Sequence, residues 1–363
     1  VMKILYVITQ LGVGGAEVVL VSMANKMVEL GHQVEIVSLL NINTQKFDDK
    51  IDVHVLDLKN NSIHASMQFI KIIKNFNPDV VHSHCLHANI ITRFYRLFCP
   101  MKRLITTAHN TYEGQGLIMS IFKYTNFLSN VVTNVSTDAV VAFEKSGYVK
   151  HNQMKVMFNI INIDKFEFSQ DLRDEYRNKF KINEDEQILI SVGSMKDSKD
   201  YPNLLSAIQL VKERVTKKFR VFVVGDGDLM GETQQLASEL GVKQNISFLG
   251  VRNDVNALLS MADIFVLSSK HEGLPTVLIE AAMAKNLIIT TDCGGIDDIL
   301  PTRENVVAIQ NPLELAEKIV TIIQASHEET NQQIEKTYLH VKEVFNSNKI
   351  AKHWLNIYQD KLK

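Results

Sequence analysis

Short apolar runs alternate with longer amphipathic segments along the first half of the chain. The apolar runs predict buried strands at KILYVIT (3–9), QVEIVSL (33–39), DVVHS (79–83), RLITTA (103–108) and VVTNVS (131–136). Helical spacing predicts helices between them, at 15–30, 63–76, 86–98 and 137–146. Gly31 follows the first helix in the C′ position that favours glycine. This alternation predicts a parallel sheet covered by helices on both faces.

The alternation pauses over residues 156–168, and a charged stretch follows. It then restarts with the strands ILISVG (188–193), RVFVVG (220–225), NISFLG (245–250), DIFVLSS (263–269) and NLIITT (286–291). The helices predicted here span 201–214, 229–240, 254–261 and 275–285, and residues 312–363 are predicted to be helical throughout. The second half therefore repeats the rhythm of the first.

This repetition predicts an α/β protein of two Rossmann-like parallel-sheet domains that face a central cleft. We place the N-terminal domain at residues 1–162 and the second domain at 163–345. The segment 346–363 is a C-terminal helix, and Trp354 and Tyr358 give it an apolar face expected to pack back on the first domain. Ligands of open parallel sheets bind beyond the carboxyl ends of the strands, so the residues that follow strands are the informative ones.

Composition narrows the class of protein. The chain has 363 residues, of which 45% are hydrophobic and 22% charged, with a net charge of −2. These values exclude a disordered chain and a globally nucleic-acid-binding one. The first residues resemble a strand rather than a secretory signal, and no apolar run reaches the roughly 18–20 residues that span a bilayer. Three widely spaced cysteines suit a reducing compartment, so we expect a cytoplasmic protein.

Glycine turns follow three of the predicted strands, and the one in VVGDGDLM, at Gly225 and Gly227, is expected to be a simple turn. TQLGVGGAE contains Gly14 and Gly15, but Glu17 takes the place of the third glycine of G-x-G-x-x-G. A structural turn and a phosphate-binding turn both remain open here. Lys199, in SVGSMKDSKDYPNLL, also follows a strand, and it fits either a phosphate contact or a solvated loop.

Histidines gather after two strands of the first domain. VVHSHCLHAN places His82 and His84 on one face of a strand end, with His87 three residues further. The spacing lacks the carboxylate or cysteine partners of a zinc site, so we expect hydrogen bonding and no metal. His109 also ends a strand and is expected to point into the presumed cleft.

The segment KHEGLPTVLIEAAMAK carries the most specific pattern. Glu272 lies in a turn after a strand, Pro275 is expected as the first residue of a helix, and Glu280 lies about five residues into it, hence roughly 7–8 Å along the axis. A ligand with a central phosphate and hydroxyl-bearing rings at both ends, such as a nucleotide sugar, fits this arrangement. The alternative is a solvent-exposed Glu272 with a helix-surface Glu280.

These motifs resemble glycosyltransferase family 4. EGLPTVLIEAAMA with its E-x7-E pattern, the early GGAE and the lysine motif KDYPNLL carry the resemblance, which extends along nearly the whole chain. It implies a retaining enzyme of GT-B architecture that uses a nucleotide-activated sugar, a UDP-sugar in preference to a GDP-sugar. It implies no metal and no further cofactor.

The resemblance also implies residue roles. His109 would touch the donor sugar, Lys199 would stabilise the departing diphosphate, and Glu272 would hold the transferred sugar; these three form the catalytic set. Glu280 would bind the ribose hydroxyls. The donor-binding set is Gly14, Gly15, Gly193, Ser194, Gly225, Val251, Arg252, Gly273, Leu274, Pro275, Thr276 and Glu280.

Two positions depart from the family pattern. Gly193-Ser194 stands where the family has Gly-Arg, so one positive charge at the diphosphate is missing. Either Lys196 or Arg252 replaces it, or stabilisation of the leaving group is weaker. Asn159-Ile160 stands where the linker has Asn-Gly, which would stiffen the hinge.

Local charge bears on the acceptor. Between residues 62 and 130 there are seven Lys or Arg against two acids, and RFYRLFCPMKR mixes basic with aromatic residues. Either a solvated helix end or a surface that rests on anionic lipid gives this pattern. We expect a hexose or N-acetylhexosamine to pass to a saccharide acceptor on the inner face of the cytoplasmic membrane. The family resemblance implies that this acceptor is lipid-linked and that the reaction belongs to surface polysaccharide synthesis.

Three other functions are alternatives to sugar transfer. A sugar epimerase of the same architecture stays open. An NAD-dependent oxidoreductase needs the full glycine fingerprint and an acid after the second strand, and EIVSLLN supplies none. A non-catalytic sugar-binding module fits poorly with the presence of Glu272, Glu280 and Lys199 together.

Overall fold

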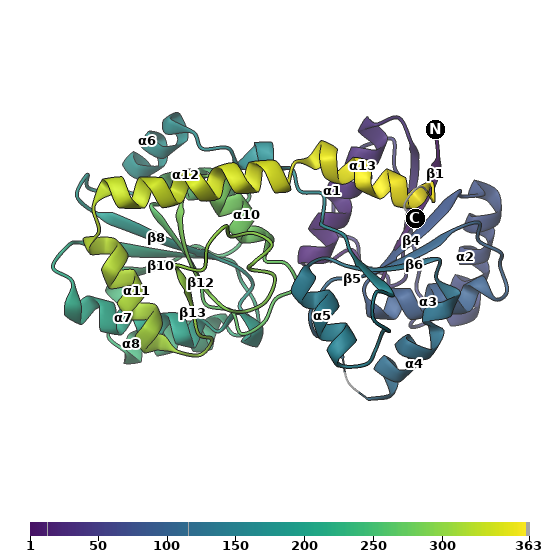
Figure 1. Cartoon of the computed structure of the whole chain (residues 1–363), viewed down its shortest axis with the longest axis horizontal. Helices are drawn as coiled ribbons and strands as arrows, with labels where there is room; N and C mark the ends of the chain where they lie inside the picture. Colours follow the sequence, from purple (N-terminus) through teal and green to yellow (C-terminus); the bar gives the residue numbers. More distant parts are fainter. Residues whose placement is uncertain (13, 115, 361–363) are drawn as a thin grey trace. The chain divides into compact units, whose positions relative to one another are not determined.

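The structure is a computed structural model that describes residues 1–12, 14–114 and 116–360. The chain forms two compact units (Figure 1). Unit 1 contains Val1–Ile161 together with the C-terminal segment from Ser347, and unit 2 contains Asn162–Asn346. Two parallel sheets with helices packed on them confirm the predicted α/β class, whereas the predicted cleft between domains stays a prediction.

Unit 1 is built on a seven-stranded parallel sheet of order β3-β2-β1-β4-β5-β6-β7. Its strands are β1 (Lys3–Ile8), β2 (Gln33–Ser38), β3 (Asp52–Val55), β4 (Val80–His84), β5 (Leu104–Ala108), β6 (Val131–Asn134) and β7 (Met154–Val156). Its helices are α1 (Gly15–Glu29), α2 (Ser62–Phe76), α3 (Leu86–Arg96), α4 (Leu117–Thr125), η1 (Asn126–Leu128), α5 (Thr137–Lys145) and α13 (Ser347–Tyr358).

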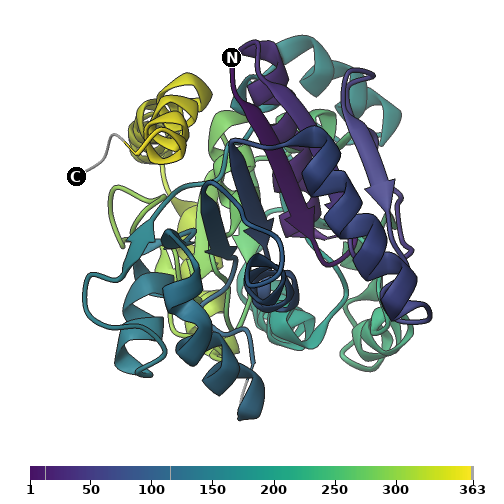
Figure 2. The ribbon, with the colours of Figure 1, turned by 90° about the vertical axis from the view of Figure 1, so that its right-hand side faces the viewer.

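Successive side chains of a strand point to opposite faces of this sheet. On one face, Leu5 and Val7 of β1 pack with Phe69 of α2 in a buried apolar cluster. On the other face, the Tyr6 hydroxyl lies 3.0 Å from that of Tyr358 on α13. Figure 2 shows α13 and α2 on opposite sides of the sheet. The C-terminal helix is thus part of the core of unit 1, where Trp354 is fully buried.

Unit 2 is built on a six-stranded parallel sheet of order β10-β9-β8-β11-β12-β13. Its strands are β8 (Gln187–Val192), β9 (Phe219–Val224), β10 (Ile246–Phe248), β11 (Ile264–Leu267), β12 (Leu287–Thr291) and β13 (Val306–Val307). Its helices are η2 (Ile163–Phe166), α6 (Gln170–Lys179), η3 (Asp197–Lys199), α7 (Tyr201–Arg214), α8 (Met230–Glu239), η4 (Lys243–Asn245), α9 (Val255–Met261), α10 (Thr276–Met283), α11 (Pro312–Gln324) and α12 (His327–Val344).

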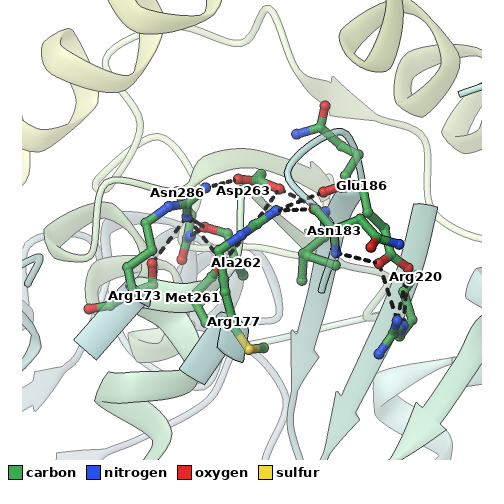
Figure 3. Close-up of polar contacts among 12 residues, drawn as sticks. Arg173, Arg177, Asn183, Glu186, Arg220, Met261, Ala262, Asp263 and Asn286 are labelled. Carbon is green, nitrogen blue, oxygen red and sulfur yellow. Dashed lines mark hydrogen bonds and ion pairs between the residues drawn. The ribbon is translucent and has the colours of Figure 1, made fainter. Parts of the chain in front are cut away.

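The charged stretch between the two repeats forms α6, which the apolar pattern did not predict. Its arginines face the protein: Arg173 donates to the carbonyls of Met261 and Ala262 and pairs with Asp263 (Figure 3). Arg177 donates to the Glu186 carbonyl at 3.0 Å. These contacts attach α6 to the amino ends of β8 and β11, at the edge of the sheet opposite the residues that follow the strands.

The prediction of a continuously helical tail is wrong. The tail contains α11, α12 and α13, and the breaks come where capping groups end one helix and begin the next. Ser326 starts α12 with a capping box, in which its hydroxyl and the Glu329 carboxylate satisfy free N–H groups. Gly31 does follow α1 with φ +83°, as predicted for C′. No helix of the described residues is long and apolar enough to cross a membrane.

Candidate functional site

Lys199 and Glu272 form an ion pair at the carboxyl edge of the unit 2 sheet. Lys199 ends η3, which follows β8, and Glu272 lies in the turn between β11 and α10. Lys199 Nζ donates to Glu272 Oε1 at 2.6 Å, and the Ser269 hydroxyl donates to the same oxygen at 2.7 Å. The two charged side chains are 18% and 16% exposed. A cation held this way can exchange its carboxylate partner for a ligand anion.

The loops after three neighbouring strands are joined by hydrogen bonds. The Ser268 hydroxyl donates to the Lys199 carbonyl at 2.9 Å, which ties the loop after β11 to that after β8. The Glu272 N–H donates to the Cys293 carbonyl at 2.6 Å, which ties it to the loop after β12. These backbone contacts determine where the carboxylate of Glu272 and the ammonium of Lys199 meet.

The loop after β12 was not singled out from the sequence. Gly295 has φ +69°, and a Cβ there would lie 2.5 Å from the Gly273 carbonyl oxygen. Only glycine allows this approach, so Gly295 supports the Gly273-Leu274 turn from behind. The Gly294-Gly295 pair directly after a strand was the signal that could have identified it.

Gly193 and Gly225 lie where β8 and β9 end side by side. Gly225 has φ +132°, and a Cβ there would lie 2.0 Å from the Gly193 carbonyl oxygen. A Cβ on Gly193 would in turn lie 3.3 Å from Cε of Lys199. The two glycines therefore let the loops pack closely and leave room for the lysine stem, whatever else they contact.

The helix that carries Glu280 begins one residue later than predicted. Pro275 is the N-cap residue, with a non-helical ψ of 85°, and Thr276 is the first helical residue. Thr276 and Val277 keep free N–H groups at this end, where a helix favours an anion. Glu280 is partly buried further along the same helix, and burial raises the pKa of its carboxyl to about 7 against an opposing effect of Lys165.

The residues predicted to contact the base, or to replace the missing positive charge, differ in their exposure and pairing. Val251 is 68% exposed in the loop after β10. The Arg252 guanidinium bonds the Asp254 carboxylate, with Nε donating at 2.8 Å. Lys196 is exposed on the loop that also carries Ser194. Arg252 is thus already paired, which leaves Lys196 as the better candidate for the charge absent at Ser194.

The glycine turn of unit 1 opens α1. Gly14 is the N-cap residue in an extended conformation, and Gly15 is the first helical residue. The Glu17 carboxylate folds back beside them, since a Cβ on Gly14 would lie 2.4 Å from its Oε2. An anion at this helix start would meet that carboxylate, so binding there requires Glu17 to move.

His109 follows β5 in a cluster of polar groups. Its Nε2 lies 2.9 Å from His84 Nδ1, and its backbone N–H donates to Glu113 Oε1 at 2.6 Å. Burial lowers the pKa of His109 to about 4, so the imidazole is neutral at pH 7. A neutral imidazole at a strand end can donate to or accept from a ligand hydroxyl. Sequence reasoning did not assign Glu113 a role.

His82 and His84 are packed in the core of unit 1, whereas His87 is exposed on α3. His82 is fully buried, with Nδ1 2.8 Å from the Tyr358 hydroxyl and Nε2 2.6 Å from the Thr107 hydroxyl. Its two ring nitrogens are therefore both occupied. Over residues 1–12, 14–114 and 116–360, no three His, Cys, Asp or Glu side chains are grouped so that they could hold a metal ion.

Comparison with known families gives matches over both units. Residues 13–165 match the family model Glycosyltransferase Family 4, and residues 173–340 match Glycosyl transferases group 1. The chain is 24% identical over 369 residues to N-acetyl-alpha-D-glucosaminyl L-malate synthase of Bacillus anthracis, covering 97% of this chain and 95% of that one. It is 25% identical to the capsular polysaccharide biosynthesis glycosyltransferase CapH of Staphylococcus aureus, over 80% of this chain and 81% of CapH.

Solved structures show the same fold. The structure of Alr3699/HepE from Anabaena in complex with UDP and glucose superposes with a TM-score of 0.84 over 99% of this chain and 100% of HepE, at 16% identity. Two parallel sheets of seven and six strands, with this likeness, confirm the predicted GT-B fold.

Proposed function

The chain belongs to the glycosyltransferases of group 1 and family 4, and we propose that it transfers a hexose or N-acetylhexosamine from a UDP-sugar to a saccharide acceptor with retention of configuration. The pair of Lys199 and Glu272 at the carboxyl edge of unit 2, beside the helix that carries Glu280, is the observation that supports this most directly. Membership of the family confirms that the chain is a glycosyltransferase. The donor, the acceptor and the residue roles are our proposal.

In this proposal the donor diphosphate lies against the N-terminus of α10 and Lys199. The free N–H groups of Thr276 and Val277 and the ammonium of Lys199 supply positive potential where the leaving diphosphate gains charge. Lys199 then shares its hydrogen bonds between Glu272 and the phosphate. Glu272 accepts hydrogen bonds from hydroxyls of the transferred sugar, and Glu280 accepts those of the ribose. Gly193, Gly225 and Gly273 let the backbone approach the ligand.

The bond changes balance without an enzyme nucleophile. The acceptor oxygen attacks the anomeric carbon on the face from which the diphosphate departs, so the new C–O bond retains the configuration. The bond from the anomeric carbon to the diphosphate oxygen breaks, and the acceptor hydroxyl proton passes to that phosphate oxygen. In this proposal His109, neutral at pH 7, hydrogen-bonds the donor sugar from unit 1. Gly14 and Gly15 contact the diphosphate only if Glu17 swings away.

We place the reaction in the synthesis of a surface polysaccharide on a lipid-linked acceptor. The named activity of CapH, in capsular polysaccharide biosynthesis, supports this setting. The name of N-acetyl-alpha-D-glucosaminyl L-malate synthase of Bacillus anthracis, which matches over 97% of this chain, points instead to L-malate. The acceptor is therefore the part of the proposal for which a direct experiment matters most.

A thermal-shift panel of UDP-, GDP- and ADP-sugars, with NAD included, tests the donor class. We expect a UDP-sugar to raise the melting temperature most, with a GDP-sugar as the second candidate, because binding to the native state alone stabilises it. Equal stabilisation by NAD would favour the oxidoreductase. An epimerase would convert the sugar nucleotide without releasing UDP, whereas release of UDP that depends on added saccharide supports transfer.

Chelation of metals is expected to leave the transfer rate unchanged. Asp226 and Asp228 form the D-x-D pattern of this chain, but the potential at the diphosphate comes in our proposal from Lys199 and helix dipoles. The measurement is the rate of UDP release before and after dialysis against EDTA. Complete loss of activity, restored by zinc, would instead assign a metal to the histidines of unit 1.

We further propose that unit 1 rests on an anionic membrane through an aromatic surface at the ends of α3 and α4. Six large apolar side chains are exposed there, between 45% and 78%: Phe94, Leu97, Phe98, Leu117, Tyr124 and Phe127. Arg96 joins the two helix ends by donating to the Leu128 carbonyl at 2.6 Å, and Lys123 lies exposed among them. An apolar patch of this extent with basic neighbours fits a lipid interface.

One of the seven basic residues counted in this region does not belong to that surface. Arg93 is fully buried and donates to the Phe122 carbonyl at 3.0 Å and to the Thr106 hydroxyl at 2.8 Å. Its guanidinium holds α3 against α4 and β5 and does not face the solvent. The electrostatic attraction therefore comes from the exposed Lys71, Lys74, Lys102 and Lys123, with Lys102 already paired to Asp79.

Vesicle sedimentation tests this surface. Replacing Phe98 and Phe127 by serine is expected to lower binding to vesicles of phosphatidylglycerol and phosphatidylcholine by at least about tenfold, because each buried phenyl ring contributes about 1.5–3 kcal/mol. Ile63→Ser, at a 75% exposed position on α2, is the control and should bind as the wild-type chain does. Equal binding of the double variant and the control would remove the membrane from the proposal.

A further inference from the structure

Glu113 has a buried carboxylate that its surroundings satisfy only in part. Oε1 accepts the His109 N–H at 2.6 Å, whereas Oε2 is buried and has no hydrogen-bond partner among the described residues. A buried, unpaired carboxylate oxygen is costly, and proteins rarely keep one unless a ligand or water completes it. Burial raises the pKa of the Glu113 carboxyl to about 7, although the backbone N–H groups of His109 and Asn110 favour its charged form.

The groups around Glu113 come from three elements at the carboxyl edge of the unit 1 sheet. Cys85 follows β4, and burial together with the negative charges of Glu113 and Glu17 raises the pKa of its thiol. His109 follows β5, and Glu17 lies in the first turn of α1. Among the described residues, Oε1 of Glu113 is bonded by the His109 N–H and Oε2 has no partner, so the carboxylate is not half of a structural ion pair.

His84 adds a second incomplete group at the same edge. Its Nδ1 is bonded to Nε2 of His109, and its Nε2 is buried without a partner. The next residue, Cys85, has φ +74°, a conformation that non-glycine residues rarely adopt. Backbone strain of this kind persists where the surrounding structure imposes it, often at functional sites.

The free groups of this cluster define the chemistry of a ligand. A carboxylate oxygen accepts hydrogen bonds only, whereas an imidazole nitrogen either donates or accepts. A hydroxyl group matches both, because it donates one bond and accepts others. A second carboxylate, Glu17, and the absence of a cation disfavour an anionic ligand. The cluster therefore suits a neutral, hydroxyl-rich group such as a pyranose.

We propose that Glu113 and His84 form a subsite for the hydroxyl groups of the saccharide acceptor, in which Glu113 Oε2 accepts a hydrogen bond from one hydroxyl and His84 Nε2 contacts another. This rests on the proposed function, since it assigns the acceptor to unit 1, and it adds residues that the sequence motifs did not include. Glu113 is connected through the His109 backbone N–H to the residue proposed to touch the donor sugar.

Glu113→Gln separates this role from a purely structural one. The amide oxygen of glutamine can still accept the His109 N–H, so a loop anchor would survive the change. At pH 8, where the Glu113 carboxyl is mainly ionised, the substitution removes the charged acceptor for the saccharide, and this loss is expected to raise the KM for the acceptor by about tenfold or more. The KM for the nucleotide sugar and the thermal shift that it gives should stay at the wild-type values.

The probe acceptors are the octyl glycosides of glucose, galactose, mannose and N-acetylglucosamine, measured by UDP release from the donor that the thermal-shift panel identifies. His84→Gln is the second variant and should show the same selective rise in the acceptor KM. A wild-type acceptor KM in Glu113→Gln overturns the inference, and so does a rise confined to the donor KM. If none of the four glycosides accelerates release by the wild-type chain, the pyranose subsite is wrong.

The proposed function has a separate outcome in the same experiment. If a nucleotide sugar stabilises the wild-type chain, the donor site is supported irrespective of the acceptor KM measured for Glu113→Gln. Failure of every nucleotide sugar to stabilise the chain would instead remove the donor assignment, irrespective of the glycosides. The melting temperature of each unliganded variant, compared with that of the wild-type chain, shows that the variant is folded.

Discussion

Replacing Lys199 by methionine is expected to lower the rate of sugar transfer by about 10²–10³-fold, because a preorganised charge that stabilises the leaving group contributes on this scale. Methionine keeps an unbranched side chain, which fits beside Gly193. Space there is limited, because a Cβ on Gly193 would lie 3.3 Å from Cε of Lys199. The substitution therefore removes the ammonium while it preserves packing. The loss should fall mainly on kcat, since the diphosphate gains charge as the bond breaks.

The measurement is the initial rate of UDP release at saturating donor and acceptor. Lys217→Met is the matched control: Lys217 is exposed and its Nζ donates to Gln187, at the amino edge of the sheet. Lys199→Met also leaves the Glu272 carboxylate without its cation. The double variant Lys199→Met with Glu272→Gln removes that unpaired charge, so its rate shows how much of the loss comes from the carboxylate. Transfer at the wild-type rate in Lys199→Met would exclude the lysine from leaving-group stabilisation.

Replacing Glu280 by glutamine is expected to weaken binding of the nucleotide sugar by about 10–100-fold at pH 8, since hydrogen bonds to a charged group contribute about 1.5–3 kcal/mol. Glutamine has nearly the same shape as glutamate, so the helix that carries it should be unaffected. Alanine at this position should remove the thermal shift altogether. Titration calorimetry with the nucleotide sugar gives the affinity directly.

The same site predicts a dependence on pH. Burial raises the pKa of Glu280 to about 7, so the carboxylate form that accepts two hydrogen bonds is the minor form below pH 7 and the major form above it. Donor affinity should therefore rise between pH 6 and pH 8 in the wild-type chain. A nucleotide sugar has no ionisation of its own in this range, whereas free UDP does, so the sugar nucleotide is the ligand to use.

Glu280→Gln should flatten this dependence, because glutamine does not titrate. Glu213→Gln, at an exposed position on α7, is the control and should keep the wild-type profile. An affinity that falls as the pH rises from 6 to 8 would contradict the assignment of Glu280 to the ribose.

The architecture was accessible from local patterns. Apolar runs with a strand period and amphipathic runs with a helical period recur through both halves, and each is decided by a few adjacent residues. The motif around Glu272 and Glu280 was likewise readable, since a strand, a turn with glycine and proline, and a helix follow one another without interruption. Elements with weak patterns were missed, such as α6, whose arginines bond to carbonyls rather than to solvent.

Contacts between distant segments were not accessible in this way. Lys199 and Glu272 were placed separately after their strands, and their hydrogen bond depends on the order of strands in the sheet. Glu113 carries no motif, because its importance comes from what lies against it. The seven basic residues counted between positions 62 and 130 include Arg93, but its guanidinium lies in the core.

The sequence by itself determined the fold class, the glycosyltransferase family and the segments that follow each strand, because these depend on periodicity and on short motifs. Only the tertiary structure decided which side chains are buried, paired or left incomplete. Burial sets the ionisation of Glu113, Glu280 and His109, and burial is a property of the tertiary surroundings of a residue rather than of its own type.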